Sequence, residues 1–201
     1  VTRLVAHQLD GAHVPWVGVD GDNNNAHLAR YHRFPDQVAR SNAASPDFCN
    51  DLIDAMGNNI DAVVLVDLPA GRSESFLAEF ETFEFAARCM KRPILKVFVM
   101  DALYDSVNQL RQTAERIPFS KTIVVLNGRV AKSRAEFDIW NSSATRTEFL
   151  ECGGAELFVP PLHAPSVKFM EGGSDAGFLS FDEALALTDL PPSIQYNLQH
   201  Y

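Results

Sequence analysis

The chain has 201 residues, a hydrophobic fraction of 46% and a formal net charge of −9 at pH 7. This length is enough to bury a sizeable core in one domain, and no apolar run approaches the roughly 18 residues that a membrane span needs. The acidic balance argues against strong non-specific binding to DNA. The wide spacing of Cys49, Cys89 and Cys152 favours a reducing cytoplasm over a disulfide framework or a zinc site.

Short apolar runs and helix-period segments alternate along the chain. Because the runs are apolar at successive positions, they are typical of parallel strands buried on both faces. The predicted strands are residues 14–19, 62–66, 94–100, 122–126 and 156–159. The predicted helices are residues 4–9, 48–56, 76–87 and 101–117, and residues 21–46 are predicted as loop with room for one helical turn. This order predicts an α/β fold with a mostly parallel, doubly wound sheet flanked by helices.

Carboxylates follow the first two predicted strands. Asp20 and Asp22 follow the first, and Asp67 follows the second, ahead of a tight Leu-Pro-Ala-Gly loop that ends at Gly71. In open α/β sheets ligands bind at the carboxyl ends of strands, where such side chains hold Mg²⁺ and orient an attacking water. The second motif is typical of a Walker B strand, whose loop could face a terminal phosphate. Turn chemistry is an equal alternative for the first motif, and a strand-to-helix cap is the alternative for the second.

Asn127 ends the fourth predicted strand and precedes Gly128 and Arg129. An amide side chain carries a donor and an acceptor side by side, which matches the edge of a nucleotide base. Taken by itself, an asparagine that caps a turn before glycine is the simpler interpretation.

In their order and spacing, these motifs resemble the ParA/MinD group of P-loop ATPases over nearly the whole chain. The resemblance implies that the protein binds ATP or ADP with Mg²⁺, hydrolyses ATP and forms a homodimer in the ATP-bound state. It implies that Asp67 binds the metal through water and that Asp20 serves both metal and catalysis. Asp22 is the favoured organiser of the attacking water.

The same resemblance implies further nucleotide-binding roles. Gly71 would meet the γ-phosphate, Asn127 would read the adenine and Arg129 would stack on the base. The segment Pro160-Pro161-Leu162 would flank the base through backbone contacts.

One part of the family pattern has no counterpart in the sequence. The group carries a deviant Walker A loop, K-G-G-x-G-K-[ST], and these 201 residues contain no G-K-[ST]. Residues 2–9 resemble the helix that follows this loop, so we expect roughly 15–20 residues, a strand and the loop, ahead of Val1. Residues 1–201 would then be a single nucleotide-binding domain without its first strand and P-loop. Without such a segment, triphosphate binding is in doubt, and the strand at residues 14–19 lies at a sheet edge.

Two short segments, residues 22–31 and 178–185, resemble TraL/MobD-type ParA-like proteins of conjugative and mobilisable plasmids. In the second segment, Ser180 and Glu183 also form a capping box on their own merits. The resemblance implies a function in plasmid mobilisation or maintenance, or in positioning cellular cargo, with a protein partner from that machinery. MinD-type proteins end in a basic membrane helix, but residues 193–201 contain no Lys or Arg, so no membrane binding is expected.

Two other classes of function fit the same fold. One is a nucleotide-dependent scaffold that recruits partners without hydrolysis, and the other is an ATP-dependent synthetase similar to dethiobiotin synthetase. The upstream sequence separates them, because a deviant Walker A loop favours the switch and an ordinary one favours the synthetase. The absence of both favours the scaffold.

Overall fold

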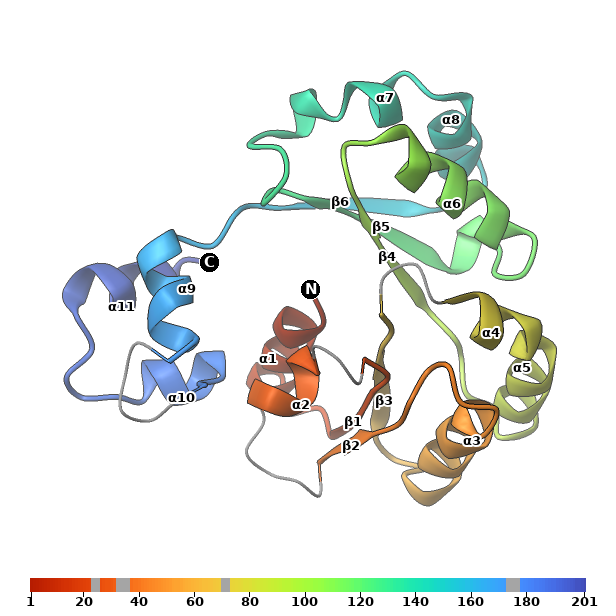
Figure 1. Ribbon diagram of the computed structural model, residues 1–201, viewed down its shortest axis with the longest axis horizontal. Coiled ribbons are helices and arrows are strands. Elements are labelled where there is room, and N and C mark those ends of the chain that lie inside the picture. The colour runs from red at the N-terminus through yellow and green to blue at the C-terminus, as the bar shows by residue number, and fades with distance from the viewer. Residues whose placement is uncertain (23–25, 32–36, 70–72, 173–177) are drawn as a thin grey trace. The chain divides into compact units, whose positions relative to one another are not determined.

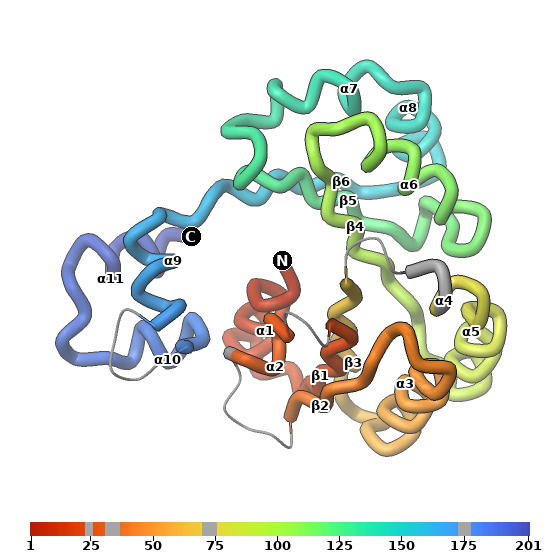
Figure 2. Tube along the Cα trace, viewed as in Figure 1, coloured from red at the N-terminus to blue at the C-terminus, as the bar shows by residue number. Residues whose placement is uncertain are grey.

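The computed structural model describes residues 1–22, 26–31, 37–69, 73–172 and 178–201. They form two compact units, Val1–Arg92 with His163–Tyr201 and Pro93–Leu162. Each unit contains a three-stranded sheet in which every described strand pair is parallel (Figure 1, Figure 2). The predicted α/β class and the parallel strands are confirmed, whereas one continuous sheet in a single domain stays a prediction.

The first unit is built around the sheet β2-β1-β3. Its strands are β1 (Trp16–Asp20), β2 (Val38–Arg40) and β3 (Val63–Asp67). β1 has a parallel neighbour on each side, so the expectation that it lies at a sheet edge unless another strand precedes Val1 is wrong. The helices are α1 (Thr2–Gly11), α2 (His27–Tyr31), α3 (Phe48–Asn58), α4 (Ser73–Ala78), α5 (Phe80–Cys89), α9 (Ala164–Met170), α10 (Phe181–Leu185) and α11 (Pro192–Gln199).

Helices α1 and α2 cover one face of this sheet. Trp16 of β1 packs there with Ala6 of α1, Leu28 of α2 and Val38 of β2. Gly18, two residues along the strand, faces the same way, because side chains alternate along a strand. A Cβ at Gly18 would lie 2.9 Å from Leu28 Cδ2, so glycine at this position lets α2 approach the sheet closely.

The other side of the sheet is covered by α3, against which α5 packs (Figure 1). The rings of Phe48 and Phe76 meet edge to face with centroids 5.9 Å apart, and Phe76 also contacts Phe80 and Phe83 of α5. All of these rings are buried, so these phenylalanine side chains belong to the core of this unit.

Two further features of the first unit differ from the sequence prediction. The single helix predicted over residues 76–87 is broken at Glu79, whose backbone N–H donates to the carbonyl of Phe76 at 3.1 Å. This tight turn ends α4 and restarts the chain as α5. The predicted loop over residues 21–46 contains both α2 and the strand β2, which aligns Val38 with Gly18 of β1. Pairing with β1, and not its own short polar sequence, makes this segment a strand.

The second unit is built around the sheet β4-β5-β6. Its strands are β4 (Lys96–Met100), β5 (Thr122–Asn127) and β6 (Ala155–Val159). The helices are α6 (Tyr104–Ala114), α7 (Asp138–Asn141) and α8 (Ala144–Glu151), with short 3₁₀ helices at Phe119–Lys121 and Arg134–Glu136.

The helices of this unit bury one face of its sheet. Val124 and Leu126 of β5 lie in a core with Trp140 and Phe149 of α7 and α8. Beside this core, Glu156 of β6 accepts hydrogen bonds from Arg146 Nε at 2.9 Å, from Arg146 Nη2 at 2.8 Å and from Trp140 Nε1 at 3.1 Å. This network ties α7 and α8 to the sheet. Among the helices in the described parts of both units, none is long and apolar enough to cross a bilayer.

Candidate functional site

The carboxyl ends of β1 and β3 bring two predicted site residues together. Asp20 and Asp67 end adjacent parallel strands and are aligned in the same register. Aligned residues of parallel neighbours point to the same face of a sheet, so both carboxylates belong to the face that α1 and α2 cover. The predicted juxtaposition of these two aspartates at one sheet edge is confirmed.

Asp20 is completely buried and has backbone partners for both carboxylate oxygens. Oδ1 accepts the N–H of Asp22 at 3.1 Å, and Oδ2 accepts the N–H of Ala29 at 2.9 Å. Ala29 lies in the first turn of α2, where backbone N–H groups have no partner within the helix. Asp20 therefore caps α2 from the end of β1, a structural role that leaves further lone pairs on its oxygens for a cation.

Asp67 is held by a hydroxyl from α1. Thr2, the first residue of that helix, donates from Oγ1 to Asp67 Oδ1 at 2.7 Å. Burial raises the pKa of the Asp67 carboxyl above its ordinary value; the Thr2 hydrogen bond opposes this rise and the nearby charge of Asp20 adds to it. A cation placed at this edge would stabilise the ionised form of Asp67.

The donor set at this edge fits Mg²⁺ in one particular mode. Mg²⁺ commonly binds one or two carboxylates and takes its remaining oxygens from waters and substrate phosphates. Asp20 and Asp67 supply two carboxylates, and Thr2 brings a hydroxyl oxygen beside them. Within the described ranges, no group of three or more His, Cys, Asp or Glu side chains is placed to hold a metal. These donors match a cation that also takes oxygens from waters or from a phosphate.

Thr2 lies at this edge and was not predicted as a site residue from the sequence. One signal could have indicated Thr2: it is a hydroxyl residue in the first turn of a helix that was expected to follow a phosphate-binding loop. Its contact with Asp67 spans 65 positions of the chain, which no local pattern reports.

The backbone between the two aspartates is also fixed. Gly21 donates its N–H to the carbonyl of Asp67 at 2.8 Å, and a Cβ at Gly21 would lie 3.0 Å from that oxygen. Asp22 follows directly and is half-buried. The segment that carries the predicted water-organising carboxylate therefore lies against the end of β3. Gly71, predicted to meet the γ-phosphate, lies outside the described residues.

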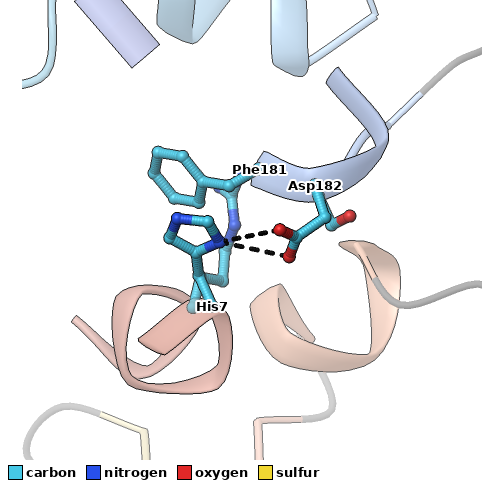
Figure 3. Close-up of a pocket in the computed structure, with 5 residues that line it drawn as sticks. His7, Phe181 and Asp182 are labelled. Atoms are coloured by element: carbon cyan, nitrogen blue, oxygen red, sulfur yellow. Dashed lines mark hydrogen bonds and ion pairs between the residues drawn. The ribbon is translucent and has the colours of Figure 1, made fainter. Parts of the chain in front are cut away.

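Helix α1 is secured by α10 (Figure 3). His7 Nδ1 lies 3.1 Å from both carboxylate oxygens of Asp182, and its ring stacks on Phe181 with centroids 5.2 Å apart. The guanidinium of Arg3 lies 5.8 Å from the centroid of the Phe181 ring. The predicted capping box is confirmed at Ser180, where α10 begins. These contacts fix the helix whose first residue holds Asp67.

The predicted base-binding residues gather in the second unit, at the carboxyl ends of β5 and β6. Asn127 is aligned with Val159 across the sheet, and Gly128 donates its N–H to the carbonyl of Val159 at 2.8 Å. A Cβ at Gly128 would lie 2.5 Å from that oxygen and 2.9 Å from Pro160 Cα. Only glycine allows the two strand ends to approach so closely, which brings Pro160 next to the asparagine loop.

The Asn127 side chain forms the turn that the simpler interpretation predicts. Its Oδ1 accepts the N–H of Arg129 at 3.1 Å, while its Nδ2 is a hydrogen-bond donor at the strand end. Arg129, Pro160 and Pro161 are exposed and Leu162 is half-buried. The arrangement offers one amide, one guanidinium and a rigid proline segment at the same edge, which are groups that can contact a planar base.

Comparisons with known proteins find a distant similarity. No family model and no solved structure matches the chain. The chain is similar to protein MobD of Acidithiobacillus ferrooxidans, with 23% identity over 144 residues, which are 72% of this chain and 63% of MobD. The match therefore spans less than two thirds of MobD. It agrees with the predicted likeness to MobD-type proteins, whereas membership of the ParA/MinD group stays a prediction.

Proposed function

We propose that this protein is an ATP-binding switch of the ParA/MinD type that hydrolyses ATP and joins two copies in the ATP-bound state. On this proposal its strands belong to one doubly wound sheet of the P-loop NTPase type. The similarity to MobD favours plasmid mobilisation or maintenance as its setting, with a protein partner of that machinery.

The observation that carries this proposal is the arrangement of Asp20, Asp67 and Thr2. Two aligned carboxylates end adjacent parallel strands, and a hydroxyl at the start of α1 donates to one of them. The N-terminus of a helix carries a partial positive charge and favours phosphate. An acidic edge beside such a helix start suits a nucleotide phosphate together with its cation.

Each residue would have a distinct role. Asp67 would hold Mg²⁺ through a bound water, and Asp20 would orient α2 while adding charge to the metal site. Mg²⁺ would neutralise the phosphate charge that develops during transfer. Asp22 would orient the attacking water, and the bonds from Gly21 to Asp67 and from Asp22 to Asp20 would hold it in place. Asn127 would contact the adenine, with Pro160 beside it.

The first experiment tests the metal-dependent part on the complete protein. Asp67→Asn should weaken Mg²⁺-dependent binding of a fluorescent ATP analogue by about tenfold or more. Asp54→Asn, the same change at an exposed position of α3, should leave binding unchanged. Titrations with Mg²⁺ and with EDTA measure the difference. Equal Mg²⁺-dependent affinity in Asp67→Asn and the unaltered protein would refute the assigned role.

The second experiment tests hydrolysis. Asp22→Ala should retain ATP binding and slow hydrolysis by ~10²–10⁴-fold, because an oriented water is lost while phosphate contacts remain. The ATP-bound dimer should then accumulate in gel filtration, and Asp189→Ala, at an exposed position, should behave like the unaltered protein. A mutant that stays monomeric, or that cannot bind ATP, contradicts the switch. A protein with no turnover to lose supports the scaffold, and turnover that requires a second substrate supports the synthetase.

A further inference from the structure

A cavity of about 320 Å³ lies in the first unit. Its walls come from the loop after β2, the first turn of α3 and the junction of α4 with α5. The lining includes Ala43, Phe48, Cys49, Phe76 and Glu79. This volume lies at the lower end of the range of small-molecule sites, which is about 300–1,000 Å³.

The cavity has an apolar, aromatic wall. Phe48 and Phe76 meet edge to face at 5.9 Å between centroids, an arrangement that fixes both rings. Ala43 and Ala44 stand on the loop side, where small side chains leave the space open. The shape suits a compact ring or a short aliphatic body.

One carboxylate gives the cavity its charge. Glu79 is the charged residue among the described lining residues. The Cys49 thiol donates to the backbone carbonyl of Glu79 at 3.9 Å. Burial raises the pKa of that thiol, and the Glu79 carboxylate raises it further, so Cys49 stays neutral beside the acid. An anionic ligand would meet Glu79 unfavourably, whereas a cationic one would gain an ion pair.

The cavity wall also touches the carboxylate edge. Ala43 donates its N–H to the carbonyl of Gly21 at 3.1 Å, and Gly21 donates to Asp67. The ring of Phe48 lies 3.3 Å from where a Cβ on Gly21 would be. A ligand that moves Ala43 or Phe48 would therefore move the backbone between Asp20 and Asp22.

We propose that this cavity binds a compact organic cation, an apolar ring or chain with one ammonium group, between the Phe48–Phe76 wall and the Glu79 carboxylate. The binding is separate from ATP hydrolysis and does not require it. An occupied cavity would adjust the backbone between Asp20 and Asp22.

Two probes of matched size and opposite charge test the proposal, namely phenethylamine and 3-phenylpropionate. Each is titrated into the complete, nucleotide-free protein and followed by ¹H–¹⁵N NMR. Phenethylamine should shift the amide signals of Ala43, Ala44 and Glu79 and bind about fivefold more tightly than the anion. Glu79→Gln should remove this preference while binding of the ring remains.

A second part of the experiment fills the cavity with a large side chain. Ala78→Trp should abolish phenethylamine binding, whereas Ala186→Trp, at an exposed position beside the end of α10, should not. The proposal is overturned if neither probe binds, if both bind equally to the unaltered protein, or if binding survives in Ala78→Trp. Because no nucleotide is present, these outcomes are independent of the ATPase experiments. Should Ala78→Trp fail to fold, the comparison with Glu79→Gln still decides.

Discussion

Lys96 is a cation that the second unit buries at a cost. It begins β4 on the face that carries Phe98 and Met100, and its Nζ donates to Thr113 Oγ1 of α6 at 2.8 Å. Burial lowers the pKa of Lys96 from 10.5 to about 8. At a pH below about 8 the buried Lys96 amine is protonated, and this charge destabilises the folded state. Replacing Lys96 by an apolar residue of similar length should therefore stabilise the protein.

The size of this effect follows from the two pKa values. The difference of 10.5 minus about 8 corresponds to about 3.4 kcal/mol at 1.36 kcal/mol per pKa unit. Because the side chain keeps some contact with solvent, we reduce this to about 1–2 kcal/mol. Lys96→Met also loses the hydrogen bond to Thr113, which is worth about 1 kcal/mol. Thr113 keeps its own bond to the carbonyl of Leu110 at 3.0 Å. The net gain at pH 7 should be about 0–1 kcal/mol.

The stabilisation by Lys96→Met should depend on pH in a defined direction. Between pH 8 and 10.5 the unfolded chain binds more protons at Lys96 than the folded chain, so the stability of the unaltered protein rises with pH. The advantage of Lys96→Met should therefore shrink from pH 7 to pH 9.5.

Urea unfolding measures this difference, with buried Trp140 as the fluorescent reporter in a Trp16→Phe background. Lys132→Met, at an exposed position of the same unit, is the control. Destabilisation by Lys96→Met at pH 7, or an advantage that grows with pH, would refute the reasoning.

Three further predictions concern single contacts. Gly128→Ala should cost about 1–3 kcal/mol in urea unfolding, because its Cβ would lie 2.5 Å from the carbonyl of Val159, whereas Gly11→Ala meets open space and should not destabilise. Glu156→Gln should cost about 1–3 kcal/mol at pH 7, since the carboxylate loses its bond to Arg146. That hydrogen bond lowers the pKa of Glu156, so its stabilisation is present above the unfolded pKa and the gap between variant and unaltered protein should close in urea melts as the pH falls. The pKa of Asp67 is raised, so its contribution to stability depends on pH in the opposite way to that of Glu156: the free energy of unfolding falls as Asp67 ionises with rising pH. Asp67→Asn should therefore melt higher than the unaltered protein at pH 7 without Mg²⁺, and the two should converge near pH 3; a lower melting point at pH 7 would contradict this.

The sequence by itself predicted five of the six described strands and the helices α1, α3 and α6, and it merged α4 and α5 into one helix. The helices α7, α8, α9 and α11 were not predicted. Continuous apolar runs placed β1, β3, β4, β5 and β6 within one or two residues at their ends. The predicted burial of these strands on both faces is not observed in the second unit, where Val97, Val99 and Leu157 of β4 and β6 are exposed. The capping box at Ser180 was also predicted correctly, because its hydrogen bonds join residues three positions apart. Parallel strands share one direction, so the sequence also placed Asp20 and Asp67 together at a carboxyl edge.

The tertiary structure decided what depends on distant partners. β2 is a strand because its backbone pairs with that of β1. Asp20 caps α2 because that helix begins beside the end of β1. Thr2 reaches Asp67 across 65 positions, and the cavity beside Phe48 exists because α3 and the turn at Glu79 meet there. Side-chain periodicity reports which face of an element is buried. It does not report which element lies against that face, because that contact joins residues with no fixed spacing in the chain.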